Sequence, residues 1–231
     1  MILYHGSNVR VDKIDLGKSR PAKDFGRAFY LSAEKEQAVE MAQFKVETFG
    51  GEVMVNNFGF DEAGLDGLKF LSFNSYTEEW AKFVLANRNS TAMLHDFDVV
   101  YGPIANDRIG RQIFNLQAGY IDFDTRHKTY PLSGRNYFSM GFLYRTCYKT
   151  SSKTMNVTEN DFQYMLECQE RDIATILVEQ CEMSIHQALS VLYGSKTYQL
   201  LKNKRSGLFF QSPYYVYSFL QDEMNTGAID H

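Results

Sequence analysis

The sequence predicts an α+β domain followed by a small all-helical module, and three observations support this fold class. Short apolar runs typical of β-strands alternate with helical segments in the first part of the chain. From Thr158 onward, apolar residues recur only at helical spacing, behind repeated capping signals. A segment rich in Ser, Thr and Lys separates the two parts, a composition that packs poorly. We therefore expect an α+β domain at residues 1–148, a linker at 149–157 and a helical module at 158–231.

The first part of the chain contains four runs typical of β-strands. They are Ile2 to Tyr4, Ala28 to Leu31, Val53 to Val55 and Asp98 to Tyr101. The last run lies in the segment HDFDVVYGPIAND, where a Gly-Pro turn is expected to end the strand. In that segment the acidic residues are expected to cap turns; the alternative places Asn106 and Asp107 on a loop at a substrate mouth.

Two helices are expected between these strands. The first spans residues 32–47, with Ser32 as its N-cap and acidic residues in its first turn. The second spans residues 77–88, where Thr77 caps the start and a buried stripe begins at Trp80. With the strand-like runs, these helices give the mixed α+β pattern.

Capping signals also locate the helices of the C-terminal module. They are Thr158 with Asp161, the capping box from Ser184 to Gln187 with Gly194 as its stop, and Ser212 before Pro213. The Tyr-rich apolar faces of these helices are expected to pack on the first domain. The alternatives are a bound partner helix and an inhibitory lid over a ligand cleft.

Composition narrows the class of protein. In 231 residues, 44% are apolar and 15% aromatic, which suffices for a substantial core. Three cysteines, Cys147, Cys168 and Cys181, form no CxxC pair, so reduced thiols and no metal site are expected. No run of about 18 apolar residues and no signal-peptide pattern occurs, which indicates a cytoplasmic protein without a membrane span. The net charge of −4 argues against a general nucleic-acid coat.

Two motifs carry the functional prediction. YHGS ends the first strand-like run and contains His5, and DFGRAFYLS leads into the second run and contains Tyr30. In this order, the motifs resemble the ADP-ribosyltransferase fold in its His-Tyr-Glu branch, which includes diphtheria toxin and the poly(ADP-ribose) polymerases. The chain is more closely similar to a largely uncharacterised family of small bacterial ADP-ribosyltransferase-like proteins, which share YHGSN, DFGxGFYL and HDYDIVxGPVADD. The helical tail resembles a module found beside or fused to such domains.

The resemblance implies a split mixed β-sheet core with flanking helices, and NAD as a substrate. It implies that His5 hydrogen-bonds a ribose hydroxyl of NAD, that the backbone of Gly6 holds the nicotinamide amide, and that Tyr30 stacks on the nicotinamide ring. An imidazole offers one donor and one acceptor, and an aromatic face attracts a cationic pyridinium, so both roles fit the residue types. The remaining residues expected to bind the cofactor are Ser7, Arg20, Asp24, Gly26 and Arg27, with a guanidinium on the diphosphate.

Cleavage of the bond between nicotinamide and ribose passes through an oxocarbenium-like sugar, which needs a negative or acceptor group nearby. The resemblance implies that a late strand supplies this group, and the corresponding segment is 129–150. Residues 125–158 contain no Asp, Glu or Gln but carry six positive charges. Candidates for the missing group are therefore Gln117, upstream of this segment, and Asn136, within it as a neutral acceptor. Gln112, Asp122 and Asp124, also upstream, are further candidates.

Two functions follow as alternatives. The first is an NAD-dependent mono-ADP-ribosyltransferase that modifies a macromolecular target, as a toxin, in a toxin–antitoxin pair for example, or as a defence effector. The second is a catalytically degenerate transferase fold that binds a protein or a nucleic acid. For nucleic acid, the six positive charges and the interleaved aromatic residues of 125–158 would pair with phosphates and stack on bases.

Overall fold

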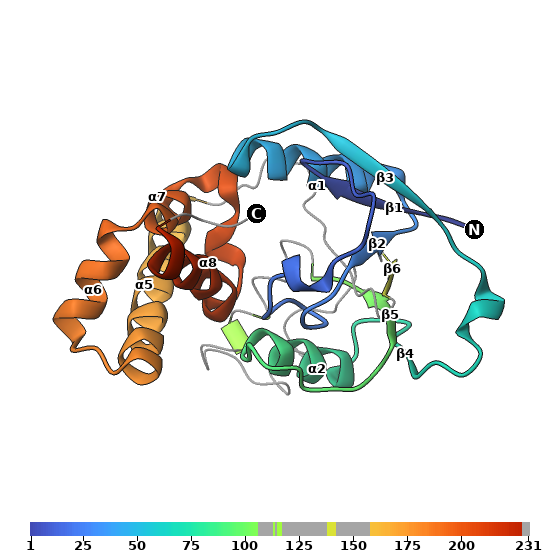
Figure 1. Cartoon of the computed structure of the whole chain (residues 1–231). Helices are drawn as coiled ribbons and strands as arrows, with labels where there is room; N and C mark the ends of the chain where they lie inside the picture. The colour runs from blue at the N-terminus through green and yellow to red at the C-terminus, as the bar shows by residue number, and fades with distance from the viewer. Residues whose placement is uncertain (106–112, 114, 117–137, 142–157, 228–231) are drawn as a thin grey trace.

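The computed structural model describes residues 1–105, 113, 115–116, 138–141 and 158–227 (Figure 1). Its strands are β1 (Ile2–Ser7), β2 (Tyr30–Ser32), β3 (Met54–Gly59), β4 (Phe70–Ser72), β5 (Val99–Pro103) and β6 (Phe138–Gly141). Its helices are α1 (Lys35–Phe49), α2 (Glu78–Arg88), α5 (Glu159–Cys181), α6 (Ile185–Gly194), α7 (Lys196–Lys202) and α8 (Pro213–Thr226). Four 3-10 turns connect them among the described residues: η1 (Leu16–Lys18), η2 (Glu62–Leu65), η3 (Lys204–Ser206) and η4 (Leu208–Phe210). The predicted α+β class with a C-terminal helical region is confirmed.

Within the described residues, the strands form one mixed sheet in the order β3-β1-β2-β6-β5-β4. Neighbouring strands are antiparallel except β4 and β5, which are parallel. Strand β6 joins the group β3-β1-β2 to the pair β5-β4, and it falls in the segment where the resemblance implies a late strand. Neither β4 nor β6 is among the strand-like runs that the sequence indicates.

Local capping signals locate most of the helix starts correctly. Thr77, Thr158, Ser184 and Ser212 each accept a backbone N–H of the first turn from the N-cap position. Such bonds satisfy a donor that the helix leaves unpaired, and each stabilises the helix by about 1 kcal/mol.

The predicted start of α1 at Ser32 is wrong. Ser32 ends β2, where it pairs with Tyr4 of β1 and Ser139 of β6, and the N-cap of α1 is Glu34. The hydroxyl of Ser32 accepts the Glu34 N–H at 3.0 Å and so supports the turn that precedes the helix. Pairing in the sheet therefore extends the strand through a residue that has a high capping preference.

The predicted Gly-Pro turn after Tyr101 is also wrong. Gly102 and Pro103 continue β5, where they pair with Ser139 and Phe138 of β6. The Trp80 indole donates to the Pro103 carbonyl at 2.8 Å, which fixes the end of this strand against α2.

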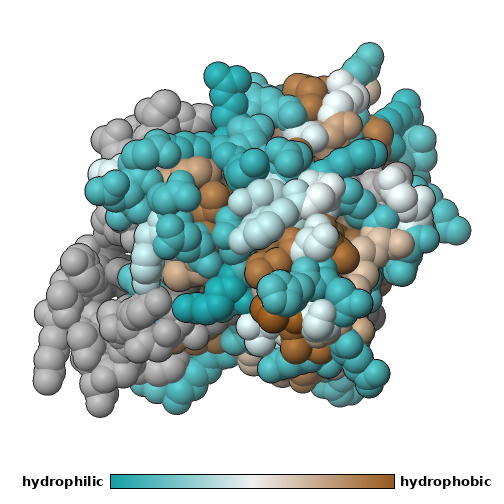
Figure 2. Space-filling view, turned by 90° about the vertical axis from the view of Figure 1, so that its left-hand side faces the viewer, coloured by the Kyte–Doolittle hydropathy of each residue, from teal (hydrophilic) through white to brown (hydrophobic). Residues whose placement is uncertain are grey.

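The helical module packs directly against the first part of the chain, and Figure 1 shows it on one side of the sheet. Ala22 belongs to the apolar core of the module, and its carbonyl accepts a hydrogen bond from Ser212 at 2.9 Å. Phe49, at the end of α1, stacks on Phe219 of α8 with ring centroids 5.8 Å apart. The outward face on this side is mainly hydrophilic, with scattered apolar patches (Figure 2).

Other expectations concern membranes, metals and cysteines. Among the residues described, no helix is long and apolar enough to cross a bilayer. The same residues bring together no group of three or more His, Cys, Asp or Glu side chains suited to a metal ion. Cys168 is buried and Cys181 half-buried, both as free thiols, while Cys147 lies outside the described residues.

Candidate functional site

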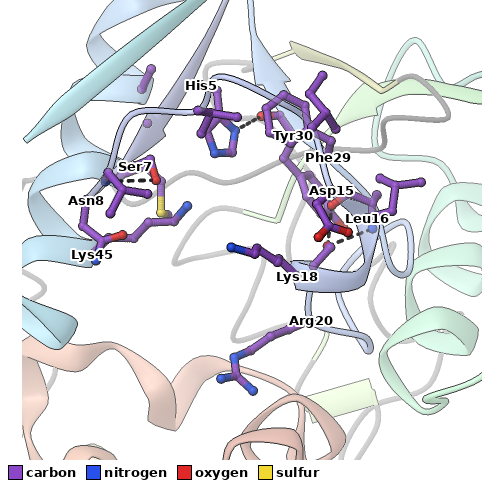
Figure 3. Close-up of a pocket in the computed structure, with 18 of the residues that line it drawn as sticks. His5, Ser7, Asn8, Asp15, Leu16, Lys18, Arg20, Phe29, Tyr30 and Lys45 are labelled. Carbon is purple, nitrogen blue, oxygen red and sulfur yellow. Dashed lines mark hydrogen bonds between the residues drawn. The ribbon is translucent and has the colours of Figure 1, made fainter. Parts of the chain in front are cut away.

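A cavity of about 720 Å³ opens beside the first motif (Figure 3). Strand β1, the loop of residues 8–20, the segment that leads into β2, helix α1 and helix α8 line its walls. The volume lies within the range of about 300 to 1,000 Å³ that small-molecule and cofactor sites occupy. The cavity is therefore large enough for a nucleotide-sized ligand.

The cavity lies where two neighbouring strands separate. Strand β1 pairs with β3 along its whole length, from Ile2 opposite Gly59 to Ser7 opposite Met54. In contrast, β1 pairs with β2 only at Tyr4, opposite Ser32. Beyond that pair, a side chain bridges the two strands: Nδ1 of the His5 imidazole lies 2.8 Å from the Tyr30 carbonyl oxygen.

This hydrogen bond determines the tautomer of His5. A carbonyl oxygen only accepts, so Nδ1 carries the hydrogen and Nε2 is left as an acceptor. Among the described residues Nε2 has no hydrogen-bond partner, and His5 lines the cavity. The ring also stacks on Phe29, with centroids 4.3 Å apart and an interplanar angle of 18°. The imidazole is thus held at two points and presents an acceptor to a ligand.

The electrostatic surroundings keep His5 neutral. The pKa of His5 is lowered from 6.5 to about 3, mainly because the ring is buried and secondly because of the positive charge of Lys45. The hydrogen bond to Tyr30 partly opposes these effects, while Lys23 adds a smaller lowering. At neutral pH the site therefore offers an uncharged imidazole, the form that accepts a hydrogen bond from a sugar hydroxyl.

The residues after His5 bring the backbone of β1 close to α1. A Cβ added to Gly6 would lie 1.9 Å from the Ala38 carbonyl oxygen, so the position requires glycine. Ser7 is buried, and its Oγ accepts the N–H of Val9 at 3.4 Å. Both Gly6 and Ser7 line the cavity.

Tyr30 also lines the cavity, but most of its ring is buried in the core. Its hydroxyl donates to the Gly26 carbonyl at 3.0 Å, and the Lys23 ammonium lies 4.8 Å from the ring centroid. A nicotinamide ring that stacked on this face would have to displace Lys23. In this structure Tyr30 instead anchors the preceding loop and orients His5 through its carbonyl group.

Three residues expected to bind the cofactor lie outside the cavity lining, because each is used within the fold. Asp24 pairs with Arg88 at 2.7 Å and accepts the Ala105 N–H at 3.0 Å. Arg27 donates to the carbonyls of Ser19 and Gly17 at 2.6 and 3.3 Å. Gly26 has a φ of 80°, a turn conformation that favours glycine. In this structure these three residues therefore have a structural role, and their contact with a cofactor stays a prediction.

Arg20 lies in the cavity wall, but its guanidinium is engaged by the helical module. It pairs with Asp222 of α8 at 2.7 Å and lies 3.5 Å from the ring centroid of Phe219. The expected grip on a diphosphate would compete with this pair. The contact instead connects the loop over the cavity to α8.

His95, the first residue of the segment HDFDVVYGPIAND, lies outside the cavity, where its Nε2 hydrogen-bonds the Phe25 carbonyl at 3.2 Å. The remaining functional predictions lie outside the described residues: Gln117 and Asn136, Gln112, Asp122 and Asp124, Asn106 and Asp107, the basic aromatic stretch apart from the backbone of β6, and the linker.

The sequence did not predict that the cavity lining carries an excess of positive charge. Its lining basic residues are Arg10, Lys13, Lys18, Arg20, Lys23 and Lys45, and its lining acidic residues are Asp12 and Asp15. Asp12 is bonded to Arg10 at 2.7 Å, and Asp15 accepts the Gly17 N–H at 2.8 Å. The cavity is therefore basic in a chain of net charge −4, which favours an anionic ligand. A basic residue within the apolar stripe of α1, Lys45, was the available signal.

Comparison with known proteins gives one family. The model of a family described as "Protein of unknown function (DUF3990)" matches residues 1–169, which include the cavity-forming strands and the first half of α5. No curated protein and no solved structure matches the chain.

Proposed function

Because the chain belongs to the DUF3990 family, whose description gives no activity, we propose a function from the cavity itself: an ADP-ribosyltransferase-like protein that binds NAD and modifies a macromolecular target. The observation that carries the proposal is the neutral imidazole of His5, which presents Nε2 to a basic cavity at the separation of β1 and β2. The identity of the ligand as NAD is inferred from the order of the motifs around His5 and Tyr30 and from their resemblance to the His-Tyr-Glu branch.

The chemistry of the cavity suits a dinucleotide. Nε2 of His5 accepts a hydrogen bond from a ribose hydroxyl, and Phe29 behind the ring keeps the imidazole in place. The excess of basic side chains in the lining offsets the negative charge of a diphosphate. The cavity volume accommodates a ligand of this size.

The proposed reaction breaks the bond between C1′ of the ribose and the nicotinamide nitrogen. The bonding electron pair leaves with the nicotinamide, whose positive charge is thereby neutralised, and a nucleophile of the target forms a bond to C1′ and loses a proton. The ribose passes through an oxocarbenium-like state, which an acceptor near the ring stabilises. Among the described residues, the cavity-lining carboxylates, Asp12 and Asp15, are bonded within their loop. We assign the acceptor to Gln117 or Asn136.

The test measures NAD binding by calorimetry and nicotinamide release by chromatography, with and without a bacterial lysate as the source of targets. His5→Gln removes the imidazole, and His186→Gln, on an exposed face of α6, is the matched control. We expect His5→Gln to weaken NAD binding about tenfold or more and to abolish release, since it removes a hydrogen bond and its acceptor geometry. His186→Gln should behave as the unchanged protein. NAD binding that is equal in all three proteins would refute the site.

A degenerate transferase is the alternative function, and the same assay separates the two. Binding of NAD that depends on His5, without release of nicotinamide in any lysate, would identify a binding protein on a transferase scaffold. Substituting Gln117 and Asn136 together then tests the assigned acceptor: in an active protein the double variant should bind NAD but release no nicotinamide.

A further inference from the structure

One face of α1 forms a wall of the cavity. Ala38, Met41, Lys45 and Phe49 all line it, at spacings of three and four residues that place them on one side of the helix. Ala38 and Met41 are buried, and Phe49 packs against the core of the helical module. Lys45 is therefore a charged side chain within an otherwise apolar stripe.

The ammonium of Lys45 has no counter-charge in the part of the chain that the structure describes. No hydrogen bond or ion pair joins it to any of these residues, although its side chain is half-buried. Burial lowers the pKa of Lys45 from 10.5 to about 8. A half-buried lysine without a partner costs folding free energy, and a group of this kind in a cavity is a candidate for binding a ligand.

A second donor near the end of β1 also lacks an acceptor. The Oγ of Ser7 accepts the Val9 N–H, and its own hydrogen has no acceptor among the described residues. Figure 3 shows Ser7 and Lys45 on the same side of the cavity, away from Asp15 and Lys18. An ammonium and a hydroxyl donor on one wall are suited to the oxygens of a phosphate group.

We propose that Lys45, assisted by the hydroxyl of Ser7, is the phosphate-binding subsite of this cavity, in the role that sequence reasoning gave to Arg20 and Arg27. The phosphate chemistry follows from the unpaired ammonium in a basic cavity; that the phosphate belongs to NAD rests on the proposed function. Arg20 and Arg27 are unsuited to the role because their guanidinium groups are bonded to Asp222 and to loop carbonyls.

The proposal predicts a link between binding and protonation. A bound phosphate favours the charged form of Lys45, so ligand binding raises its pKa and takes up a proton near pH 8. Affinity should therefore fall as pH rises above about 8. The charged and titratable groups that share the cavity with Lys45 are His5 on β1, Asp12, Asp15, Arg10, Lys13, Lys18, Arg20, Lys23, Tyr4, Tyr30 and Tyr215.

The test uses calorimetry with ADP and with inorganic pyrophosphate at pH 7 and pH 9. Lys45→Met keeps an unbranched apolar stem as far as the ε position and removes the ammonium, and Lys45→Arg keeps the charge. Lys35→Met is the control on the exposed start of the same helix. We expect Lys45→Met to weaken ADP binding about tenfold or more at pH 7 and to lose the decrease toward pH 9. Lys45→Arg should retain binding within about threefold, and Lys35→Met within about twofold. Equal ADP affinity of Lys45→Met and the unchanged protein would overturn the subsite.

Folding of the variants is checked without ligand. Lys45→Met replaces an unpaired charge in an apolar stripe, so it should unfold at a urea concentration equal to or above that of the unchanged protein. A lower midpoint would show that the charge serves the fold, and would count against the proposal.

The outcomes also separate this proposal from the proposed function. ADP and pyrophosphate binding that depends on Lys45, without NAD binding or nicotinamide release, would support the subsite and refute the transferase. NAD binding and nicotinamide release that depend on His5 but not on Lys45 would support the transferase and refute the subsite. Failure of ADP, pyrophosphate and NAD to bind at millimolar concentration would overturn both.

Discussion

Replacement of Gly6 by alanine tests the close packing of β1 on α1, which brings His5 to the cavity. The added Cβ would lie 1.9 Å from the Ala38 carbonyl oxygen and 2.8 Å from the Ala42 nitrogen. Ordinary contact begins at 3.4 Å, so strand and helix would have to separate by about 1.5 Å, the difference between 3.4 and 1.9 Å. Both neighbouring atoms belong to the backbone and have no rotamer by which to move away.

The expected cost follows from the rigidity of packed interiors. Overpacking of a core by a methyl group costs about 1 to 3 kcal/mol, and a clash with helical backbone belongs at the upper end. We therefore expect Gly6→Ala to lower the free energy of unfolding by about 3 kcal/mol, a large fraction of the 5 to 15 kcal/mol typical of a protein. A variant that remains folded should also bind NAD more weakly, because a shift of β1 moves the His5 imidazole.

Urea denaturation followed by circular dichroism measures this cost. Gly59→Ala is the matched control, because Gly59 is also a strand residue and a Cβ added there meets nothing within 4 Å. We expect the control to differ from the unchanged protein by less than about 0.5 kcal/mol. If Gly6→Ala is as stable as Gly59→Ala, the reasoning about the contact between β1 and α1 is refuted.

Two further predictions concern His5 and Asp222. The pKa of His5 is about 3 in the folded protein and 6.5 when unperturbed, so the unfolded chain alone takes up this proton between these values. The contribution of His5 to stability therefore falls as pH decreases, and between pH 7 and 5 the stability of His5→Gln should rise relative to the unchanged protein by about 2 kcal/mol in urea denaturation. If the difference in unfolding free energy between His5→Gln and the unchanged protein stays the same from pH 7 to pH 5, the buried, neutral imidazole is contradicted. Asp222→Asn breaks a partly exposed pair with Arg20 and should lower the free energy of unfolding by about 1 kcal/mol. Asp172→Asn, in a pair with its exposed neighbour on α5, should change it by less than about 0.3 kcal/mol, and equal effects of the two variants would exclude a special role of the Asp222 pair in holding α8.

The sequence by itself determines the α+β class, the C-terminal helices and most of their starting points. Helix caps depend on residues three positions apart, as at Thr77 and Thr158, so a local pattern carries the information. The placement of His5 on the first strand and of Tyr30 on the second was likewise visible in short motifs. The short strands β4 and β6 were not among the strand-like runs, and their pairing with β5 assigns them to the sheet.

Only the tertiary structure decides which charges are available to a ligand. Arg20 and Asp24 look free in the sequence, yet their partners Asp222 and Arg88 lie 202 and 64 positions away. The position of Lys45 within an apolar stripe can be seen in the sequence, yet only the folding of α1 against β1 places it in the cavity, where no described carboxylate pairs with it. Ion pairing and burial depend on distances in space, which the local pattern of a sequence does not contain.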